Sequence, residues 1–276
     1  MRHLLSTHLI VNHRLTTVWL DKIWDAGFPA LEIFCARQHL DYRDRAQTNE
    51  LAYWFRDAEL ELWSLHSPMY TDDVWGRSGP HSVISVTETS KPKRIAMVDE
   101  IKRAIEIAET IPFRYLIQHI GVGGEEWDDH KVEAAFTALE EIKVFAKQRG
   151  VEVLIENIPN AFSSSERLNY FMETTHLGLN YCFDTGHAHI MEGIEPAFNR
   201  MKERIRSTHL HDNDGERDIH RFPYIGEDIS VDWRDVMKLL RSCDDQYPLM
   251  LELREVAGME RPFDRARDVF ERLENE

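Results

Sequence analysis

The sequence predicts a single (β/α)8 barrel with parallel strands, and three observations support this fold class. The chain has 276 residues, 42% of them hydrophobic and 30% charged, which suits one large globular domain. Short, apolar, β-rich runs alternate along it with segments of helical period. No Gly-, Pro- or Ser-rich linker divides the chain, so we expect one domain over residues 1–276 with its active site at the carboxyl ends of the strands.

Eight apolar runs are the expected strands. They are LLSTHLI near residue 4, ALEIFC near 30, LELWSLH near 60, YLIQHI near 115, VEVLIEN near 151, LNYCFD near 179, IRSTHLH near 205 and PLMLEL near 248. Two doubly wound halves are the alternative arrangement. No GxGxxG or GxxxxGK[ST] motif follows any of these runs, so a nucleotide-binding fold lacks its usual fingerprint.

Two intervening segments show the helical period most clearly. In residues 131–150 the apolar stripe is Val132, Phe136, Leu139, Ile142 and Phe145, and in residues 94–109 it is Ile95, Val98, Ile101 and Ile105. We expect Asp128 or Asp129 to cap the start of the first helix and Gly150 to end it. Trp19, Trp24 and Trp54 also fall at helical spacing, which predicts that they are core residues.

Composition restricts the partners and the compartment. The net charge of −16 disfavours phosphate backbones and acidic membranes, although bound metals can invert the local sign. No run of about 18 apolar residues predicts a membrane span, and the start resembles a strand rather than a signal peptide. Three widely spaced cysteines indicate reduced thiols, so we expect a cytoplasmic protein. Homo-oligomerisation is left open.

One stretch interrupts the alternation of strands and helices. Residues 69–92, MYTDDVWGRSGPHSVISVTETSKP, form a long connection after the third strand. Connections of this length in a compact domain are usually lids, binding loops or disordered segments. We expect a lid over the barrel mouth that carries Trp75 and Arg77 toward the substrate, since a guanidinium suits a phosphate or carboxylate. A disordered surface loop is the alternative.

The ends of the predicted strands carry ionisable side chains from the third strand onward. In chain order they are His66, His119, Glu156, Asp184 with His187 three residues later, His209 with His211, Asp218 and His220 in the following loop, and Glu252. In a barrel of this class, polar residues at the carboxyl ends of the strands indicate chemistry. Zn²⁺, Mn²⁺ and Mg²⁺ accept these side chains as ligands. Convergent buried carboxylates need compensation, so the pattern predicts a divalent metal, with Asp184 as a ligand and His187 as a ligand or a substrate contact.

Each of these residues also has a simpler interpretation. A lone histidine is more often a satisfied buried residue than a ligand, and we interpret His189 and His211 as structural. Glu156 or Glu252 taken alone would pair with Arg254 or Lys143. Asp218 and His220 lie in a polar loop and are equally well interpreted as solvated. The case for a metal therefore rests on the joint pattern.

With these residues identified, the chain resembles the xylose isomerase-like TIM-barrel superfamily over nearly its whole length. The motifs ENIPN, FDTGHAHIMEG, HLHDNDG and LEL carry the resemblance. It implies a sugar epimerase or isomerase with one divalent metal on Glu156, Asp184, His209 and Glu252. The two glutamates would also transfer the proton, and His187 would contact the substrate. Asn157 in the first motif is a further expected substrate contact.

The resemblance extends to the abasic-site nucleases of the endonuclease IV class, which hold three zinc ions. Their additional ligands match His66, His119, His187, Asp218 and His220, and HSPMY is similar to their motif around the first histidine. The segment RFPYIGED is longer than its counterpart in that class. The connection after the third strand differs, and basic residues that grip DNA are not evident.

Three functions therefore remain. The favoured one is an isomerase or epimerase of a sugar or sugar phosphate, in which Zn, Mn, Mg or Co polarises the substrate while Glu156 and Glu252 move a proton through an enediolate. The second is a multi-zinc phosphoester hydrolase with up to three ions. The third is a sugar-binding barrel without turnover. The histidines favour the second, whereas the acidic charge argues against a DNA substrate.

Overall fold

The computed structural model describes residues 1–227, 229–243 and 245–276, and these residues form one eight-stranded sheet. The strands are β1 (His3–Ser6), β2 (Ala30–Phe34), β3 (Glu61–His66), β4 (Tyr115–His119), β5 (Glu152–Glu156), β6 (Asn180–Asp184), β7 (Ile205–His209) and β8 (Leu249–Leu251). Their order is β7-β6-β5-β4-β3-β2-β1-β8, and neighbouring strands pair in parallel. The sheet closes where the Leu210 amide donates to the Met250 carbonyl at 2.8 Å and the Glu252 amide to the Leu210 carbonyl at 3.2 Å. The predicted (β/α)8 barrel is confirmed.

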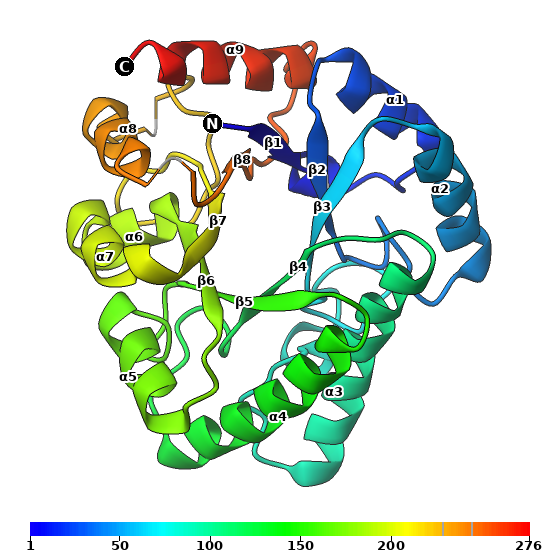
Figure 1. Cartoon of the computed structure of the whole chain (residues 1–276), viewed down its shortest axis with the longest axis vertical. Coiled ribbons are helices and arrows are strands. Elements are labelled where there is room, and N and C mark those ends of the chain that lie inside the picture. The colour runs from blue at the N-terminus through cyan, green and yellow to red at the C-terminus, as the bar shows by residue number, and fades with distance from the viewer. Residues whose placement is uncertain (228, 244) are drawn as a thin grey trace.

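The helices surround the strands as a ring (Figure 1). They are α1 (Thr17–Asp25), α2 (Arg45–Asp57), α3 (Lys91–Ile105), α4 (Asp129–Lys147), α5 (Ser165–Thr175), α6 (Thr185–Met191), α7 (Ile194–Met201), α8 (Trp233–Arg241) and α9 (Pro262–Glu274), with short 3-10 segments η1 (Thr7–Ile10), η2 (Gly79–Ser82), η3 (Glu106–Glu109) and η4 (Lys202–Arg204). No helix among the described residues has the length and apolar character needed to cross a bilayer.

Helix α4 forms as its sequence predicts. The Asp128 carboxylate caps it by accepting from the Lys131 amide at 3.1 Å, and Leu139 and Ile142 are buried against the sheet. Two predictions about apolar stripes are wrong. Ile95 of α3 is 49% exposed and Trp24 of α1 is 40% exposed, because each lies at the edge of its apolar stripe.

The period of the strands explains how the site is positioned. Alternate residues face the barrel interior. Ile117, Leu154 and Cys182 pack together there as one buried cluster on β4, β5 and β6. Two residues further along the same strands come His119, Glu156 and Asp184. The apolar layer therefore places these three ionisable side chains together in the next layer, at the carboxyl end of the barrel.

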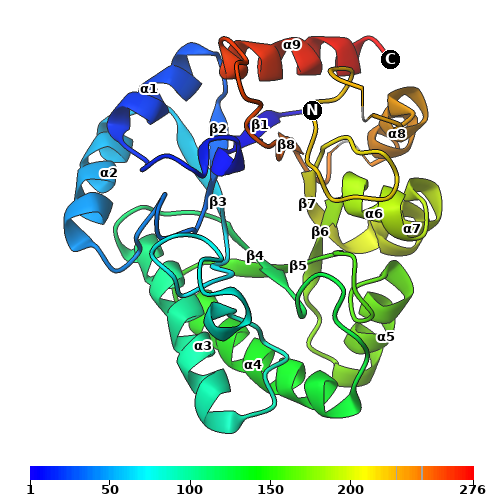
Figure 2. The same cartoon turned by 180° about the vertical axis from the view of Figure 1, so that it is seen from behind.

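The connection over residues 69–92 is partly ordered by its own contacts. Tyr70 and Val83 form an antiparallel bridge, and η2 lies between them. Figure 2 shows this cyan segment next to β3 and β4. Met69 and Trp75 of this segment line a cavity at the barrel mouth, and its role as a lid stays a prediction.

Truncating a buried residue of α4 should destabilise the barrel. Leu139→Ala removes a fully buried side chain, so we expect a loss of about 2 to 5 kcal/mol in the free energy of unfolding. Val144→Ala on the same helix is the matched control, because Val144 is 56% exposed and should cost less than about 0.5 kcal/mol. Denaturant unfolding measures both, and equal losses would contradict the described packing.

Candidate metal centre

Ten ionisable side chains gather at the carboxyl end of the barrel in three clusters, and the first two share Glu156. The first cluster is His66, His119 and Glu156; the central cluster is Glu156, Asp184, His209 and Glu252; the third cluster is His187, His211, Asp218 and His220. Within each cluster, one nitrogen or oxygen from every residue lies within 4.8 Å of the others. All the ligands anticipated from the strand ends and the following loop are thus brought together, and each group could hold a metal ion.

The first cluster joins the ends of β3, β4 and β5. The Nε2 atoms of His66 and His119 lie 3.2 Å apart, and both approach Glu156 Oε2, at 3.5 and 3.1 Å. The His66 Nδ1 atom donates to the Ser67 carbonyl at 3.0 Å. Since a carbonyl can only accept, the neutral His66 ring carries its proton on Nδ1 and directs the Nε2 lone pair at the cluster.

The central cluster is the most deeply buried of the three. His209 Nδ1 lies 3.2 Å from Glu156 Oε1, 3.4 Å from Glu252 Oε2 and 4.0 Å from Asp184 Oδ2. All four side chains are at most 2% exposed as residues. Three carboxylates around one imidazole carry more negative charge than a single proton balances, so the cluster favours a divalent cation.

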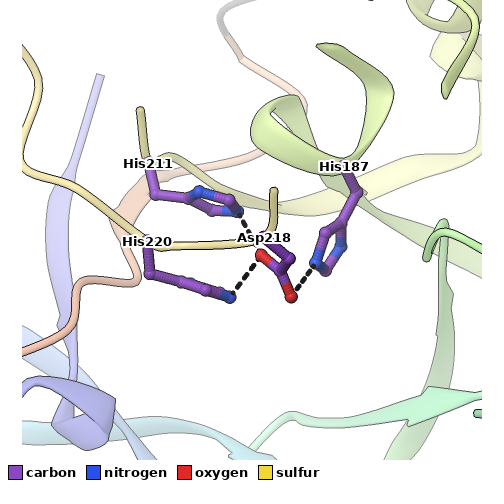
Figure 3. A group of neighbouring side chains, drawn as sticks. All are labelled: His187, His211, Asp218 and His220. Carbon is purple, nitrogen blue, oxygen red and sulfur yellow. Dashed lines mark ion pairs between the residues drawn. The ribbon is translucent and has the colours of Figure 1, made fainter. Parts of the chain in front are cut away.

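The third cluster spans α6 and the segment after β7 (Figure 3). Asp218 lies at its centre, with Oδ2 3.3 Å from His187 Nε2 and Oδ1 3.0 Å from His220 Nε2. The other ring nitrogens of these two histidines donate to backbone carbonyls, His187 to Asn157 and His220 to Glu252, both at 3.0 Å. As in the first cluster, backbone acceptors orient the lone pairs toward the shared centre.

His211 connects the third cluster with the central one. Its Nε2 atom lies 3.1 Å from Asp184 Oδ1 and 4.0 Å from Asp218 Oδ1. From its sequence context His211 was expected to be structural, whereas the structure places it among the candidate ligands. Gly186 makes room for the ring, because a Cβ at that position would lie 2.1 to 2.5 Å from three of its atoms.

The residues present fit a metal ion. Asp184 Oδ2 is buried and has no hydrogen-bond partner among the described residues, and the nearest nitrogen of the central cluster, His209 Nδ1, is 4.0 Å away. Buried polar atoms are normally satisfied, and a buried carboxylate oxygen without a donor is a ligand atom that a cation would satisfy. The donor set of imidazoles and carboxylates suits Zn²⁺ and also Mn²⁺ or Co²⁺.

Protons on the imidazoles balance the carboxylates where no metal is bound. Burial opposes the charged forms of His187 and His209, yet nearby carboxylates hold the pKa of both well above the usual range. For His220, burial likewise acts downward, but Asp218 raises the pKa to about 9. The pKa of Glu156 is lowered well below its usual range, because charged histidines, His209 foremost, outweigh its burial. Metal uptake would therefore release protons.

A cavity of about 200 Å³ opens onto the clusters. Its walls include His8, Phe34, Met69, Trp75, Ile158, Pro159 and Arg254, together with members of all three clusters. Trp75 thus lies where a substrate contact was predicted. Arg77 is absent from these walls and pairs with Asp73 on the surface at 3.4 Å, so its role stays a prediction.

Asn157 has a structural task that the sequence prediction did not include. Its side-chain amide donates to the Asp184 carbonyl at 2.8 Å, and its oxygen accepts from the Asp184 amide at 2.9 Å. This pair of bonds ties the end of β5 to the end of β6. The predicted contact between Asn157 and substrate remains untested.

Sequence reasoning missed three residues around the centre. His8 and Arg254 line the cavity. His8 lies in the run LLSTHLI, which was expected to be a strand throughout but ends as a strand at Ser6, and Arg254 was considered only as an ion-pair partner. Glu32 is fully buried inside the barrel and contacts His209. A signal for Glu32 was available, because ALEIF places one carboxylate within an otherwise apolar strand.

The chain belongs to the family of xylose isomerase-like TIM barrels, whose pattern matches residues 20–275. It is 24% identical to the uncharacterized protein y4fM of Sinorhizobium fredii, over 84% of this chain and 79% of that protein. It is 26% identical to the uncharacterized protein MJ1614 of Methanocaldococcus jannaschii, over 59% of this chain and 64% of that protein.

Solved structures share the fold over the whole chain. A D-tagatose 3-epimerase-like protein superposes with a TM-score of 0.78 and 21% identity, covering 100% of this chain and 97% of that one. The 3-keto-D-glucoside 4-epimerase YcjR from E. coli gives 0.76 and 14%, covering 100% of both chains. An IOLI protein with a bound zinc atom gives 0.77 and 15%, covering 99% and 98%. At these identities the likeness is one of fold, and the named activities belong to those proteins.

The metal-free protein should lose stability as the pH rises. Protonated His220 stabilises the folded state fully below pH 6.5, the ordinary histidine pKa, and this contribution is lost as the pH passes through about 9. Thermal unfolding in the presence of a chelator should therefore show a falling Tm between these values. His220→Gln should flatten the slope, whereas a change at the exposed His130 should not. Saturating zinc should oppose the trend, since zinc competes with protons for the same nitrogens.

Adding a methyl group at Gly186 should disturb the third cluster. Gly186→Ala gains up to about 1 kcal/mol of helix propensity, but forcing the His211 ring aside in a packed site costs about 1 to 3 kcal/mol. We expect net destabilisation, measured by denaturant unfolding. Gly123→Ala is the control, because its Cβ would meet no atom within 4 Å. A Gly186→Ala protein as stable as the wild type would contradict the described position of His211.

Proposed function

We propose that this chain is a metal-dependent hydrolase of small phosphoesters whose three clusters hold up to three divalent ions that act together. The observation that carries the proposal is the placement of Glu156. Its Oε2 atom faces His66 and His119, whereas its Oε1 atom faces His209 at 3.2 Å and His187 Nδ1 at 3.3 Å. Both oxygens are thus engaged by candidate ligand clusters, and neither is left to transfer a proton to a substrate carbon.

Divalent ions at such a centre would polarise a phosphoryl oxygen and supply a nucleophile at neutral pH. The residues of the chain have separate tasks. Glu156 links the first and central clusters, and Asp218 holds His187 and His220 around the third. In the net reaction, water adds to phosphorus, the ester P–O bond breaks and the departing alcohol takes a proton.

The cavity supports a small substrate rather than a polymer. Its volume is about 200 Å³, and Phe34, Met69, Trp75 and Ile158 give it an apolar rim that limits water. Arg254 is the one Lys or Arg among the described wall residues, so it is the natural anchor for an anionic group of the substrate. The net charge of −16 argues in the same direction, because it repels a polyanion such as DNA.

An isomerase or epimerase of a sugar or sugar phosphate is the second candidate, and it is the one that the sequence favoured. The central cluster alone has the donors for a single ion, and neighbours of the same fold include proteins named as epimerases. In this mechanism Glu156 and Glu252 would move the proton, and a single metal would suffice. His66 and His119 would then need a separate reason to be buried, since neutral apolar residues fill a barrel at lower cost.

Substituting Glu156, the carboxylate shared by the first and central clusters, should show whether it serves metal binding and catalysis or only supports the fold. We expect wild-type protein to retain two or three zinc ions per chain by elemental analysis and to hydrolyse p-nitrophenyl phosphate or its bis-ester. Glu156→Gln should lose at least one ion and reduce hydrolysis by more than about 100-fold, beyond the typical loss from an outer-shell change. Glu152→Gln on the same strand, at its exposed end, is the control.

Three other outcomes would contradict the proposed hydrolase. One zinc per chain that is unaffected by His66→Ala with His119→Ala, together with deuterium uptake from D₂O into a ketose, would contradict the hydrolase and favour the epimerase. Zinc content and turnover unchanged in Glu156→Gln would contradict both. Tight sugar binding without any product would instead favour the non-catalytic barrel.

A further inference from the structure

Glu32 is a buried carboxylate beneath the central cluster that no step of the proposed reaction uses. It lies in the middle of β2 and is 0% exposed, so it cannot contact a substrate. Its Oε1 accepts from the Ser6 hydroxyl at 3.0 Å and its Oε2 from the Ser64 hydroxyl at 2.8 Å. A buried charge is costly unless paired, and the remaining partner of Glu32 is His209.

His209 presents its two ring nitrogens to two different environments. Nε2 lies 3.2 Å from Glu32 Oε1 and 3.3 Å from Glu32 Oε2. Nδ1 faces Glu156 and Glu252 in the central cluster. An ionised carboxylate only accepts, so Nε2 keeps its proton and the lone pair of the neutral ring lies on Nδ1, toward the cluster.

We propose that Glu32 is a positioning residue for the central metal: it fixes the tautomer and ring orientation of His209 and strengthens Nδ1 as a ligand. The inference rests on the metal centre of the proposed function. A carboxylate behind a ligating histidine raises the basicity of the ligand nitrogen and fixes the ring.

The nearest acceptors of the other oriented histidines are neutral: His66, His187 and His220 donate to the backbone carbonyls of Ser67, Asn157 and Glu252. Carboxylates also lie 3.3 Å from His187 Nδ1 and 3.5 Å from His220 Nδ1, but these are Glu156 and Glu252, which belong to the clusters themselves. His209 is oriented instead by an anion, and that anion is itself held by serines from β1 and β3. The support of the central site thus reaches across β1, β2, β3 and β7, which makes it the most constrained of the three sites. We therefore expect the central ion to bind most tightly.

The test measures zinc affinity rather than turnover. Metal-free wild-type protein, Glu32→Gln and Ser64→Ala are titrated with zinc in competition with a chromophoric chelator, and the Tm of each metal-free protein is recorded. Glu32→Gln keeps the size and an accepting oxygen but loses the charge, so the tightest site should weaken about 10- to 100-fold. Ser64→Ala leaves the carboxylate in place but frees one oxygen, and a smaller loss at the same site is expected.

The control is Ser207→Ala. Ser207 is buried on β7 two residues before His209, and its hydroxyl has no hydrogen-bond partner among the described residues. Removing it should leave zinc affinity unchanged. This variant shows how the loss of a buried hydroxyl near His209 affects zinc affinity while Glu32 and its hydrogen bonds stay unchanged.

The outcomes separate this inference from the proposed function. A wild-type protein that binds zinc while Glu32→Gln binds it within twofold as tightly would overturn the role of Glu32 and leave the metal centre standing. A lower Tm with unchanged affinity would likewise assign Glu32 a structural role only. If Glu32→Gln fails to fold, the zinc affinity of Ser64→Ala becomes the test, and an unchanged affinity in that variant overturns the inference. Failure of the wild-type protein to bind zinc would overturn the metal centre and the inference together.

Discussion

The Glu156 carboxylate is the interaction on which the rest of the site depends. It ends β5 and is shared by the first and central clusters through its two oxygens. A fully buried carboxylate in this position is tolerable only if cations or protonated imidazoles surround it. The neighbouring strand ends supply these imidazoles, and the pKa directions of Glu156 and His209 are those of an ion pair. The first and central clusters are thus arranged around this one carboxylate.

The closed barrel supplies the stability that a cluster of buried charges reduces. The apolar layer of Ile117, Leu154 and Cys182 lies directly beneath, and hydrophobic burial throughout the barrel supplies the stability that convergent charges reduce. The backbone assists as well, because carbonyl groups after β3, β5 and β8 orient His66, His187 and His220. The donors are thus held in place without an ion, which would lower the ordering cost of the proposed metal binding.

Much of this arrangement could be predicted from the sequence, and the exceptions have physical reasons. His119, Glu156 and Asp184 were predictable because strand period and barrel topology place successive strand ends at one mouth. His211 was misjudged because the chain leaves the regular strand at His209, after which the period no longer gives the direction of a side chain. Its inclusion depends on the missing Cβ of Gly186, which only the packed structure reveals. Glu32 carried a signal, a lone carboxylate in an apolar strand, but its partner His209 is distant along the chain. Arg254 carried none, because only the packed structure places it in the cavity wall.

The number of ions is the quantity that separates the two enzymatic functions, and burial bears on it directly. In a mononuclear enzyme, His66 and His119 would place two imidazole nitrogens 3.2 Å apart in the cavity wall, where the His66 side chain is 2% and the His119 side chain 13% exposed. One neutral ring can donate a single hydrogen bond to the other, but Glu156 Oε2 then competes for the same proton, and two charged rings repel each other. A cation bound among these atoms would instead accept a lone pair from both rings and from the carboxylate. A metal ion would therefore account for all three donors of the first cluster, which is the physical reason for proposing a centre with more than one ion.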